Sequence, residues 1–214
     1  MQDIAIYGFG GFGREIACVL NAINKINSTW HLIGYFDDGV KAGTANRYGK
    51  VLGNMDTLNS HDKRLAVILA IASPSTIALL TGKINNSNIY FPNIIAPNVL
   101  FFDRDSFSIG IGNYIGFGGR ISCDVSMENF NFLNGCVSLG HDVSLKNFNM
   151  LQPDVRISGE TAIGDSNFFG VRSTVLQGLN IGNEVRIGVN SVVMRNTKDG
   201  FTYFGNPAKI IKDI

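Results

Sequence analysis

The stretch that decides the fold is LGHDVSLKNFNMLQPDVRISGETAIG, residues 139–164, in which an aliphatic residue returns at every sixth position. The same spacing continues in both directions without a break, from residue 109 to residue 193. The periodic residues are Ile109, Ile115, Ile121, Met127, Leu133, Leu139, Leu145, Leu151, Ile157, Ile163, Phe169, Val175, Ile181, Ile187 and Val193. Helices repeat about every 3.6 residues and strands every two, so this period indicates a repeat architecture instead.

A period of six predicts a parallel β-helix. Each unit supplies a short strand and a corner, the periodic residue points into a narrow interior, and the glycine that often follows it eases the corner. Three units close one triangular coil, so the 15 periodic residues predict about five coils. Burial of each inward side chain contributes roughly 1.5–3 kcal/mol to stability.

Residues 1–96 have a different pattern, which predicts a small parallel α/β domain. Apolar runs at 4–7, 32–36 and 65–71 predict strands, and helical spacing predicts helices over 14–26 and 75–84. Alternating strands and helices favour a parallel sheet. We therefore divide the chain into an α/β domain, residues 1–96, and a β-helix domain with a C-terminal cap, residues 97–214.

Composition narrows the function classes. The net charge of +1 gives no electrostatic argument for binding to nucleic acid or to an anionic membrane surface. The sequence contains no run of 18 apolar residues, so it predicts no membrane-spanning helix. The N-terminus lacks the pattern of a signal peptide. The three cysteines form no C-x-x-C pair, so we expect neither a disulfide framework nor a metal site. These features predict a cytoplasmic protein with reduced thiols.

A glycine-rich loop, Gly8-Phe-Gly-Gly-Phe-Gly13, follows the first predicted strand and precedes a helix. Such a loop lets the backbone approach a phosphate at the positive end of the helix. An NAD-binding domain would also need an acid about 20 residues further on, and Asp37 lies roughly there. However, the α/β part is too short for a complete dinucleotide domain, and no dehydrogenase domain follows it.

Taken together, five features resemble one known family. They are the hexapeptide series, Gly205-Asn-Pro-Ala-Lys209 after it, the glycine loop, Asp37-Asp38, and Gly140-His-Asp142 inside the repeat. The chain resembles, over almost its whole length, the hexapeptide-repeat family of sialic acid O-acetyltransferases and nucleotide-amino-sugar N-acetyltransferases. The resemblance implies a half-Rossmann N-terminal domain, a left-handed coil and a homotrimer. Acetyl-CoA would lie between adjacent β-helices, and the acceptor would be a nucleotide-linked sugar.

The resemblance also implies roles for residues of the N-terminal domain. The loop positions Gly10, Gly11 and Phe12 would touch the nucleotide sugar, although relatives often have histidine in place of Phe12. Asp37 and Asp38 would lie at the base or ribose. Ala72 and Ser73, after the third strand, would line the same crevice.

His141 is the candidate general base. It is the one histidine of three within the repeat, and it lies two residues past Leu139, which places it on the outside of a coil. A group with a pKa near about 6.5 can take a proton from an amine or hydroxyl at neutral pH, and an adjacent carboxylate, here Asp142, can orient it. From the residues alone, a surface histidine at a corner is equally possible; the resemblance makes the pair catalytic. Cys136 as an acyl-carrying nucleophile is a weaker alternative, because direct transfer needs no covalent intermediate.

The remaining site residues also come from the resemblance. Gly159 would donate its backbone N–H to the oxyanion, and Val171 and Val189 would line the CoA arm through their backbones. Lys209 would meet a CoA phosphate, unless its segment only caps the β-helix. Met150 stands where relatives often carry a second histidine, which predicts a more apolar acyl pocket.

Four hypotheses remain open at this point. The first is N-acetylation of an amino group on a UDP-type sugar, and the second is O-acetylation of sialic acid or a related sugar. The third is a non-catalytic scaffold that senses a nucleotide sugar, and the fourth is an NAD-dependent oxidoreductase. The His141-Asp142 pair favours the two enzymes over the scaffold.

Overall fold

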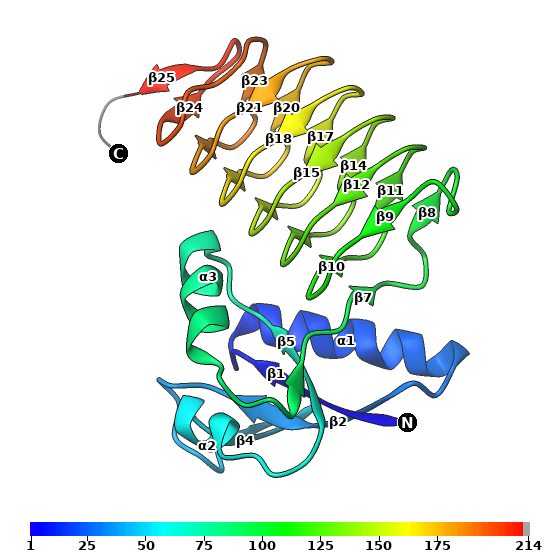
Figure 1. Ribbon diagram of the computed structural model, residues 1–214, viewed down its shortest axis with the longest axis vertical. Helices are drawn as coiled ribbons and strands as arrows, with labels where there is room; N and C mark the ends of the chain where they lie inside the picture. Colours follow the sequence, from blue (N-terminus) through cyan, green and yellow to red (C-terminus); the bar gives the residue numbers. More distant parts are fainter. Residues whose placement is uncertain (212–214) are drawn as a thin grey trace. The chain divides into compact units, whose positions relative to one another are not determined.

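The computed structural model describes residues 1–211 and divides into two compact units (Figure 1). The first unit is Met1–Pro97, and the second begins at Asn98. Within the described residues, no helix is long and apolar enough to cross a membrane. The same residues contain no group of three or more His, Cys, Asp or Glu side chains that could hold a metal ion.

The first unit is a Rossmann-like sheet with helices. Its sheet strands are β1 Gln2–Tyr7, β2 Trp30–Phe36, β3 Ala45–Asn46, β4 Gly49–Gly53, β5 Leu65–Leu69 and β6 Ile89–Tyr90, and its helices are α1 Gly11–Ile26, α2 Met55–Asn59 and α3 Pro74–Lys83. The short β7 Ile94–Ile95 follows β6 in the chain and is not part of this sheet. The six-stranded sheet has the order β3-β4-β2-β1-β5-β6. Strand β5 is buried along its whole length, as its continuous apolar run predicts for a central parallel strand.

The second unit is a parallel β-helix with three faces. One face carries β8 Leu100–Phe101, β11 Arg120–Ile121, β14 Ser138–Leu139, β17 Arg156–Ile157, β20 Thr174–Val175 and β23 Val192–Val193. The next carries β9 Ser108–Ile109, β12 Ser126–Met127, β15 Ser144–Leu145, β18 Ala162–Ile163 and β21 Asn180–Ile181. The third carries β10 Tyr114–Ile115, β13 Phe132–Leu133, β16 Met150–Leu151, β19 Phe168–Phe169, β22 Arg186–Ile187, β24 Thr202–Phe204 and the antiparallel β25 Lys209–Ile211. The coil is therefore slightly longer than the five turns predicted.

Partner residues on one face are 18 positions apart, as Leu139 and Ile157 show. This register stacks each periodic residue on its equivalent in the next coil, and every one from residue 115 to residue 193 is buried; Ile109 is half-buried. The hexapeptide period therefore predicted the fold correctly, because one inward side chain per unit fills the narrow interior.

A second interior column consists of asparagines, and the aliphatic period did not reveal it. Asn113, Asn131, Asn149 and Asn167 are all fully buried, one per coil. Each side-chain oxygen accepts a hydrogen bond from the backbone N–H one coil further on; Oδ1 of Asn131, for example, accepts from N and Nδ2 of Asn149, both at 3.0 Å. This ladder satisfies polar groups at one corner that would otherwise be buried without partners.

The corners correct one detail of the sequence interpretation. The glycines directly after the periodic residues do not have positive φ; that backbone conformation occurs two positions later, at residues such as Asp142, Glu160 and Arg172. Gly140 is needed for another reason, since a Cβ there would lie 2.5 Å from the backbone nitrogen of Gly159 in the next coil. These glycines thus permit close coil stacking, and the left-handed corner residue follows them.

Candidate active site

Two corners of the β-helix hold the predicted catalytic and CoA-binding residues. The corner that follows β14, and its equivalents in later coils, carries the column His141, Gly159, Gln177 and Arg195, which we call the histidine corner. The corner that precedes the β14 face carries the column Phe117, Gly135, Pro153, Val171 and Val189, which we call the valine corner. Successive members of each column are 18 residues apart, one per coil.

The histidine corner presents an oriented imidazole to solvent. Nδ1 of His141 lies 2.8 Å from Oδ2 of Asp142, and both side chains are about half exposed. An ionised carboxylate only accepts hydrogen bonds, so this contact assigns a proton to Nδ1, and in the neutral ring Nε2 then presents its lone pair. Asp142 is the left-handed corner residue, with φ of 57°, so the bend itself places the carboxylate beside the ring.

This pair alone does not identify a catalytic site. His31 on β2 makes the same contact, with Nδ1 2.8 Å from Oδ1 of Asp3, on a similarly exposed surface. The difference at His141 is Gly159, which lies directly against the ring: a Cβ on Gly159 would be 2.5 Å from Nε2. Within residues 1–211, the Gly159 N–H donates to no protein acceptor, while its carbonyl accepts from Gly178. A basic nitrogen and an available N–H donor therefore lie side by side at this corner.

The Gly159 contact yields a direct test. Gly159→Ala should lower the kcat of the reaction in which His141 is the expected general base by about 100-fold. The reason is that the new methyl group displaces the imidazole by roughly an ångström. The fold should survive, since the exposed ring can move and the backbone need not. Gly82→Ala, on α3, is the control, because a Cβ there would meet nothing within 4 Å. Steady-state kinetics and thermal melts of both variants would check this; equal kcat values would show that Gly159 has no role in positioning His141.

Other predicted residues lie elsewhere in the same chain. Val171 and Val189 are 38% and 51% exposed, but they belong to the valine corner and not to the histidine corner. Cys136 also lies at the valine corner, so one chain forms no Cys136–His141 pair. Met150 is fully buried on β16, a different face from His141. A single chain therefore does not assemble the predicted acyl pocket.

The predicted nucleotide-binding segments of the first unit do come together. Parallel strands β1, β2 and β5 end side by side, with Tyr7 opposite both Phe36 and Leu69. The glycine loop, the Asp37-Asp38 pair and the Ala72-Ser73 segment follow these three strands. They consequently meet at the carboxyl edge of the sheet, where open α/β sheets bind ligands. The Ser73 hydroxyl also caps α3 by accepting a hydrogen bond from Thr76.

The glycines of the loop have two different functions. Gly8 has φ of +116°, and Gly13 packs so closely against the Gly8 carbonyl that a side chain cannot fit. Both are required by the turn itself. A Cβ added to Gly10 would meet nothing within 4 Å. A Cβ added to Gly11 would meet only the tip of the Arg14 side chain. These two glycines leave the first turn of α1 open to an approaching anion, as the loop motif predicts.

Both aspartates of the pair accept hydrogen bonds from residues at the carboxyl edge of the sheet and near it. Asp37 accepts hydrogen bonds from the N–H groups of Phe9 and Gly39, at 2.9 and 2.8 Å. Asp38 accepts from the Tyr7 hydroxyl at 2.7 Å and from the N–H of Met55 at 2.9 Å. Burial, and then the hydrogen bond to Asp38, raise the pKa of Tyr7 well above its usual range, so the phenol stays protonated and donates.

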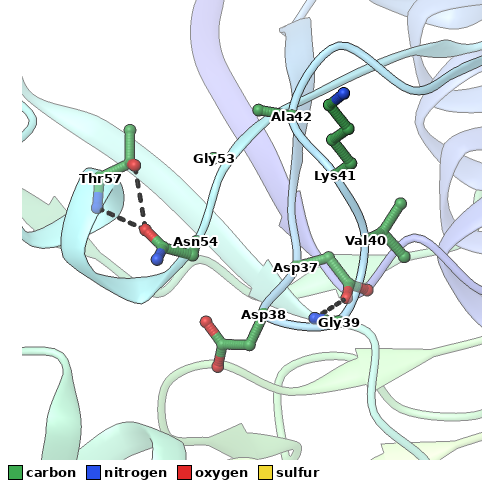
Figure 2. Close-up of a pocket in the computed structure, with 9 residues that line it drawn as sticks. All are labelled: Asp37, Asp38, Gly39, Val40, Lys41, Ala42, Gly53, Asn54 and Thr57. Atoms are coloured by element: carbon green, nitrogen blue, oxygen red, sulfur yellow. Dashed lines mark hydrogen bonds between the residues drawn. The ribbon is translucent and has the colours of Figure 1, made fainter.

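A pocket of about 370 Å³ lies beside these aspartates (Figure 2). Figure 2 shows the Asp37 carboxylate turned back to Gly39 and the Asp38 carboxylate pointing the other way. The sequence interpretation missed Lys41, Asn54 and Thr57, which line the same pocket. Asn54 caps the short helix α2 and so resembles an ordinary turn residue in the sequence.

Comparisons with known proteins agree with this architecture. Residues 3–78 match the family described as the PglD N-terminal domain. The acetyltransferase domain of PglB from Neisseria gonorrhoeae FA1090 has a TM-score of 0.89 at 23% identity, covering 99% of this chain and 100% of that one. A variant of perosamine N-acetyltransferase from Caulobacter crescentus, in complex with CoA and GDP-perosamine, has a TM-score of 0.88 at 22% identity, covering 100% and 98%.

WeeI from Acinetobacter baumannii AYE has a TM-score of 0.87 at 23% identity, covering 99% of this chain and all of its own. A search of the curated proteins found no match. The domain match and these whole-chain likenesses confirm the fold. A Rossmann-like domain is thus joined to a parallel β-helix.

Proposed function

We propose that the protein is an acetyl-CoA-dependent acetyltransferase that N-acetylates an amino group on a nucleotide-linked sugar. The observation that carries this proposal is the histidine corner, where the Asp142-oriented imidazole of His141 lies against Gly159 and its available N–H. The imidazole is not needed to close the coil, because Gln177 and Arg195 occupy the equivalent positions in later coils. The Caulobacter protein of the same fold is a perosamine N-acetyltransferase crystallised with CoA and a nucleotide sugar, which supports the same chemistry here.

The geometry suggests direct transfer. The sugar amine attacks the thioester carbonyl, and Nε2 of His141 takes the proton that the amine must lose. Asp142 holds the imidazole in the required tautomer and stabilises its charged form. The carbonyl oxygen becomes negative in the tetrahedral intermediate, and the Gly159 N–H is available to stabilise that charge. Collapse of the intermediate releases the CoA thiolate and leaves the amide.

The proposed site needs two chains. The residues expected to line the CoA arm, Val171 and Val189, lie at the valine corner, whereas His141 and Gly159 lie at the histidine corner. One acetyl-CoA can meet both sets only if the valine corner of one subunit faces the histidine corner of another. A homotrimer, as the family resemblance implies, closes this arrangement with three equivalent sites. The apolar, half-exposed valines fit such a buried contact.

The acceptor nucleotide is assigned to the carboxyl edge of the first unit. Its phosphates would lie at the open first turn of α1, around Gly10, Gly11 and Phe12. Its base or ribose would enter the pocket beside Asp37 and Asp38, which Lys41 and Asn54 also line. We assign the nucleotide to the UDP class.

A panel of acceptors tests this function. Release of CoA thiol from acetyl-CoA would be measured with UDP-, GDP- and dTDP-linked amino sugars, the corresponding free amino sugars, and free sialic acid. We expect rapid release with one UDP-linked amino sugar and little with its free sugar, because the nucleotide supplies the binding energy. Preference for GDP or dTDP would reassign the nucleotide. Release of CoA thiol with sialic acid alone would favour O-acetylation. If none of the acceptors causes release, the non-catalytic scaffold is the remaining hypothesis.

A further inference from the structure

The face of the β-helix that joins the valine corner to the histidine corner carries two arginines without acidic partners. On β11, β14, β17 and β20, which follow one another along one side of the coil (Figure 1), the outward residues are Arg120, Ser138, Arg156 and Thr174. Arg120 and Arg156 are exposed, and within residues 1–211 neither forms an ion pair with a carboxylate. The outer surface of this β14 face is therefore positively charged.

A pocket of about 380 Å³ lies over the same face. Arg156 and Thr174 line it from the face itself, and Asp154 and Arg172 line it from the valine corner. The Asp154 carboxylate already has a partner, since its Oδ2 lies 3.6 Å from Nε of Arg172. The Arg156 guanidinium and the Thr174 hydroxyl are consequently the groups that this pocket offers to an anion.

The composite site proposed above determines where this face points. In a closed ring of three, each subunit contacts one neighbour through its valine corner and the other through its histidine corner. The β14 face joins these two corners, so three such faces form the sides of a central triangle. The third corner of each coil has to point outward, because three of them turned inward would occupy the same space. The outward arginines of all three subunits therefore face the symmetry axis.

These arginines are long enough to meet at the axis. With 18 residues per coil and three faces, a side spans six residues and at most about 20 Å, which places the centre of the triangle about 6 Å from each backbone. An extended arginine side chain reaches about 6 Å from Cα to Cζ. Symmetry also puts the three copies of Arg156 at one level, so three cations converge there. Like charges at this spacing repel one another unless an anion lies between them.

We propose that the trimer binds a tetrahedral oxyanion, such as inorganic phosphate, on its symmetry axis at the level of Arg156. Such an anion has a three-fold axis of its own, so three of its oxygens can each accept hydrogen bonds from one guanidinium. The Thr174 hydroxyl, one coil further on, can donate to the same ion. Arg120 lies two coils before Arg156, about 10 Å along the axis, and forms a separate ring. The inference rests on the composite site of the proposed function, but it concerns assembly and not acetyl transfer.

Dilution of the protein tests this site through assembly, without any turnover. The fraction of trimers would be followed by sedimentation velocity at a series of protein concentrations, in sodium phosphate and in sodium chloride of equal ionic strength and pH. We expect phosphate to lower the concentration at which half of the trimers dissociate by about tenfold, because only the trimer forms the site. Arg156→Ala should abolish this response. In chloride, the same variant should form a more stable trimer than the wild type, since it lacks the converging charges.

Arg186→Ala is the matched control, because Arg186 is an exposed outward residue on β22, a face that does not turn to the axis. It should keep the full phosphate response, and loss of that response would show that phosphate acts on general surface charge. Trimers equally stable in both salts would overturn the anion site while leaving the composite site intact. A weaker Arg156→Ala trimer in both salts would also overturn it, because Arg156 would then pair with a carboxylate of a neighbouring subunit. A wild-type chain that stays monomeric at every concentration would instead contradict the composite site, and the axial site with it.

Discussion

Replacing His141 with alanine should lower kcat for acetyl transfer by about 100- to 10,000-fold, the range in which a positioned general base contributes. The affinity for CoA should hardly change, because the imidazole faces the reacting atoms and not the CoA arm. The fold should also persist, since the side chain is about half exposed and no interior group depends on it. Stopped-flow kinetics and CoA titration would separate the two effects.

His31→Ala provides an unusually close control. Its Nδ1 lies at the same 2.8 Å from an aspartate oxygen, and its side chain is also exposed, by 63% against 45% for His141. We expect normal kcat in His31→Ala, because that imidazole lies on the first unit without a glycine N–H beside it. Retention of wild-type activity in His141→Ala would show that this pair, like His31 with Asp3, is only a surface contact.

Mixing two inactive variants should restore activity. Chains with His141→Ala lack the base, and chains with Val189→Arg place a long side chain at the exposed valine corner, where the CoA arm is expected. Each variant alone should be nearly inactive. In trimers that reassemble at random from an equal mixture, about a quarter of the sites would combine an intact histidine corner with an intact valine corner from another subunit.

A second mixture gives an independent readout, once native mass spectrometry of chains with different tags has confirmed that the subunits of both mixtures have exchanged. Wild-type chains mixed with chains carrying both substitutions should give about a quarter of the wild-type activity if each site uses two chains. They should give about a half if each site lies within one chain. No recovery in the first mixture, together with half activity in the second, would contradict the composite site.

Much of the fold could be predicted because the β-helix has a strong sequence period. One buried apolar residue per strand, from Ile115 to Val193, follows directly from the hexapeptide series. The main strands and long helices of the first unit were also predicted. The short elements β3, β4 and α2 were not, because two to five residues show no clear periodicity. The buried asparagine ladder was also missed, since a polar residue at a fixed offset resembles a loop residue until the coils are stacked.

The candidate site was predictable in its parts but not in its assembly. His141 and Gly159 are 18 residues apart, and the coil period is what brings the glycine against the ring. That contact depends on three-dimensional register and cannot be read from either residue alone. Asp37 and Asp38 also have a structural role that the sequence did not reveal, because their carboxylates hold Phe9, Gly39, Tyr7 and Met55 in place. A sequence shows the carboxylates but not which donors they meet.

The most direct test of the account is the chemical identity of the product. The wild-type protein would be incubated with acetyl-CoA and the best nucleotide-linked amino sugar, and the sugar nucleotide would then be examined by mass spectrometry before and after hydroxylamine treatment. The account predicts one added acetyl group that resists hydroxylamine, as an amide does. An acetyl group removed by hydroxylamine would identify an ester and contradict N-acetylation, and an unmodified sugar nucleotide beside intact acetyl-CoA would contradict the enzyme itself.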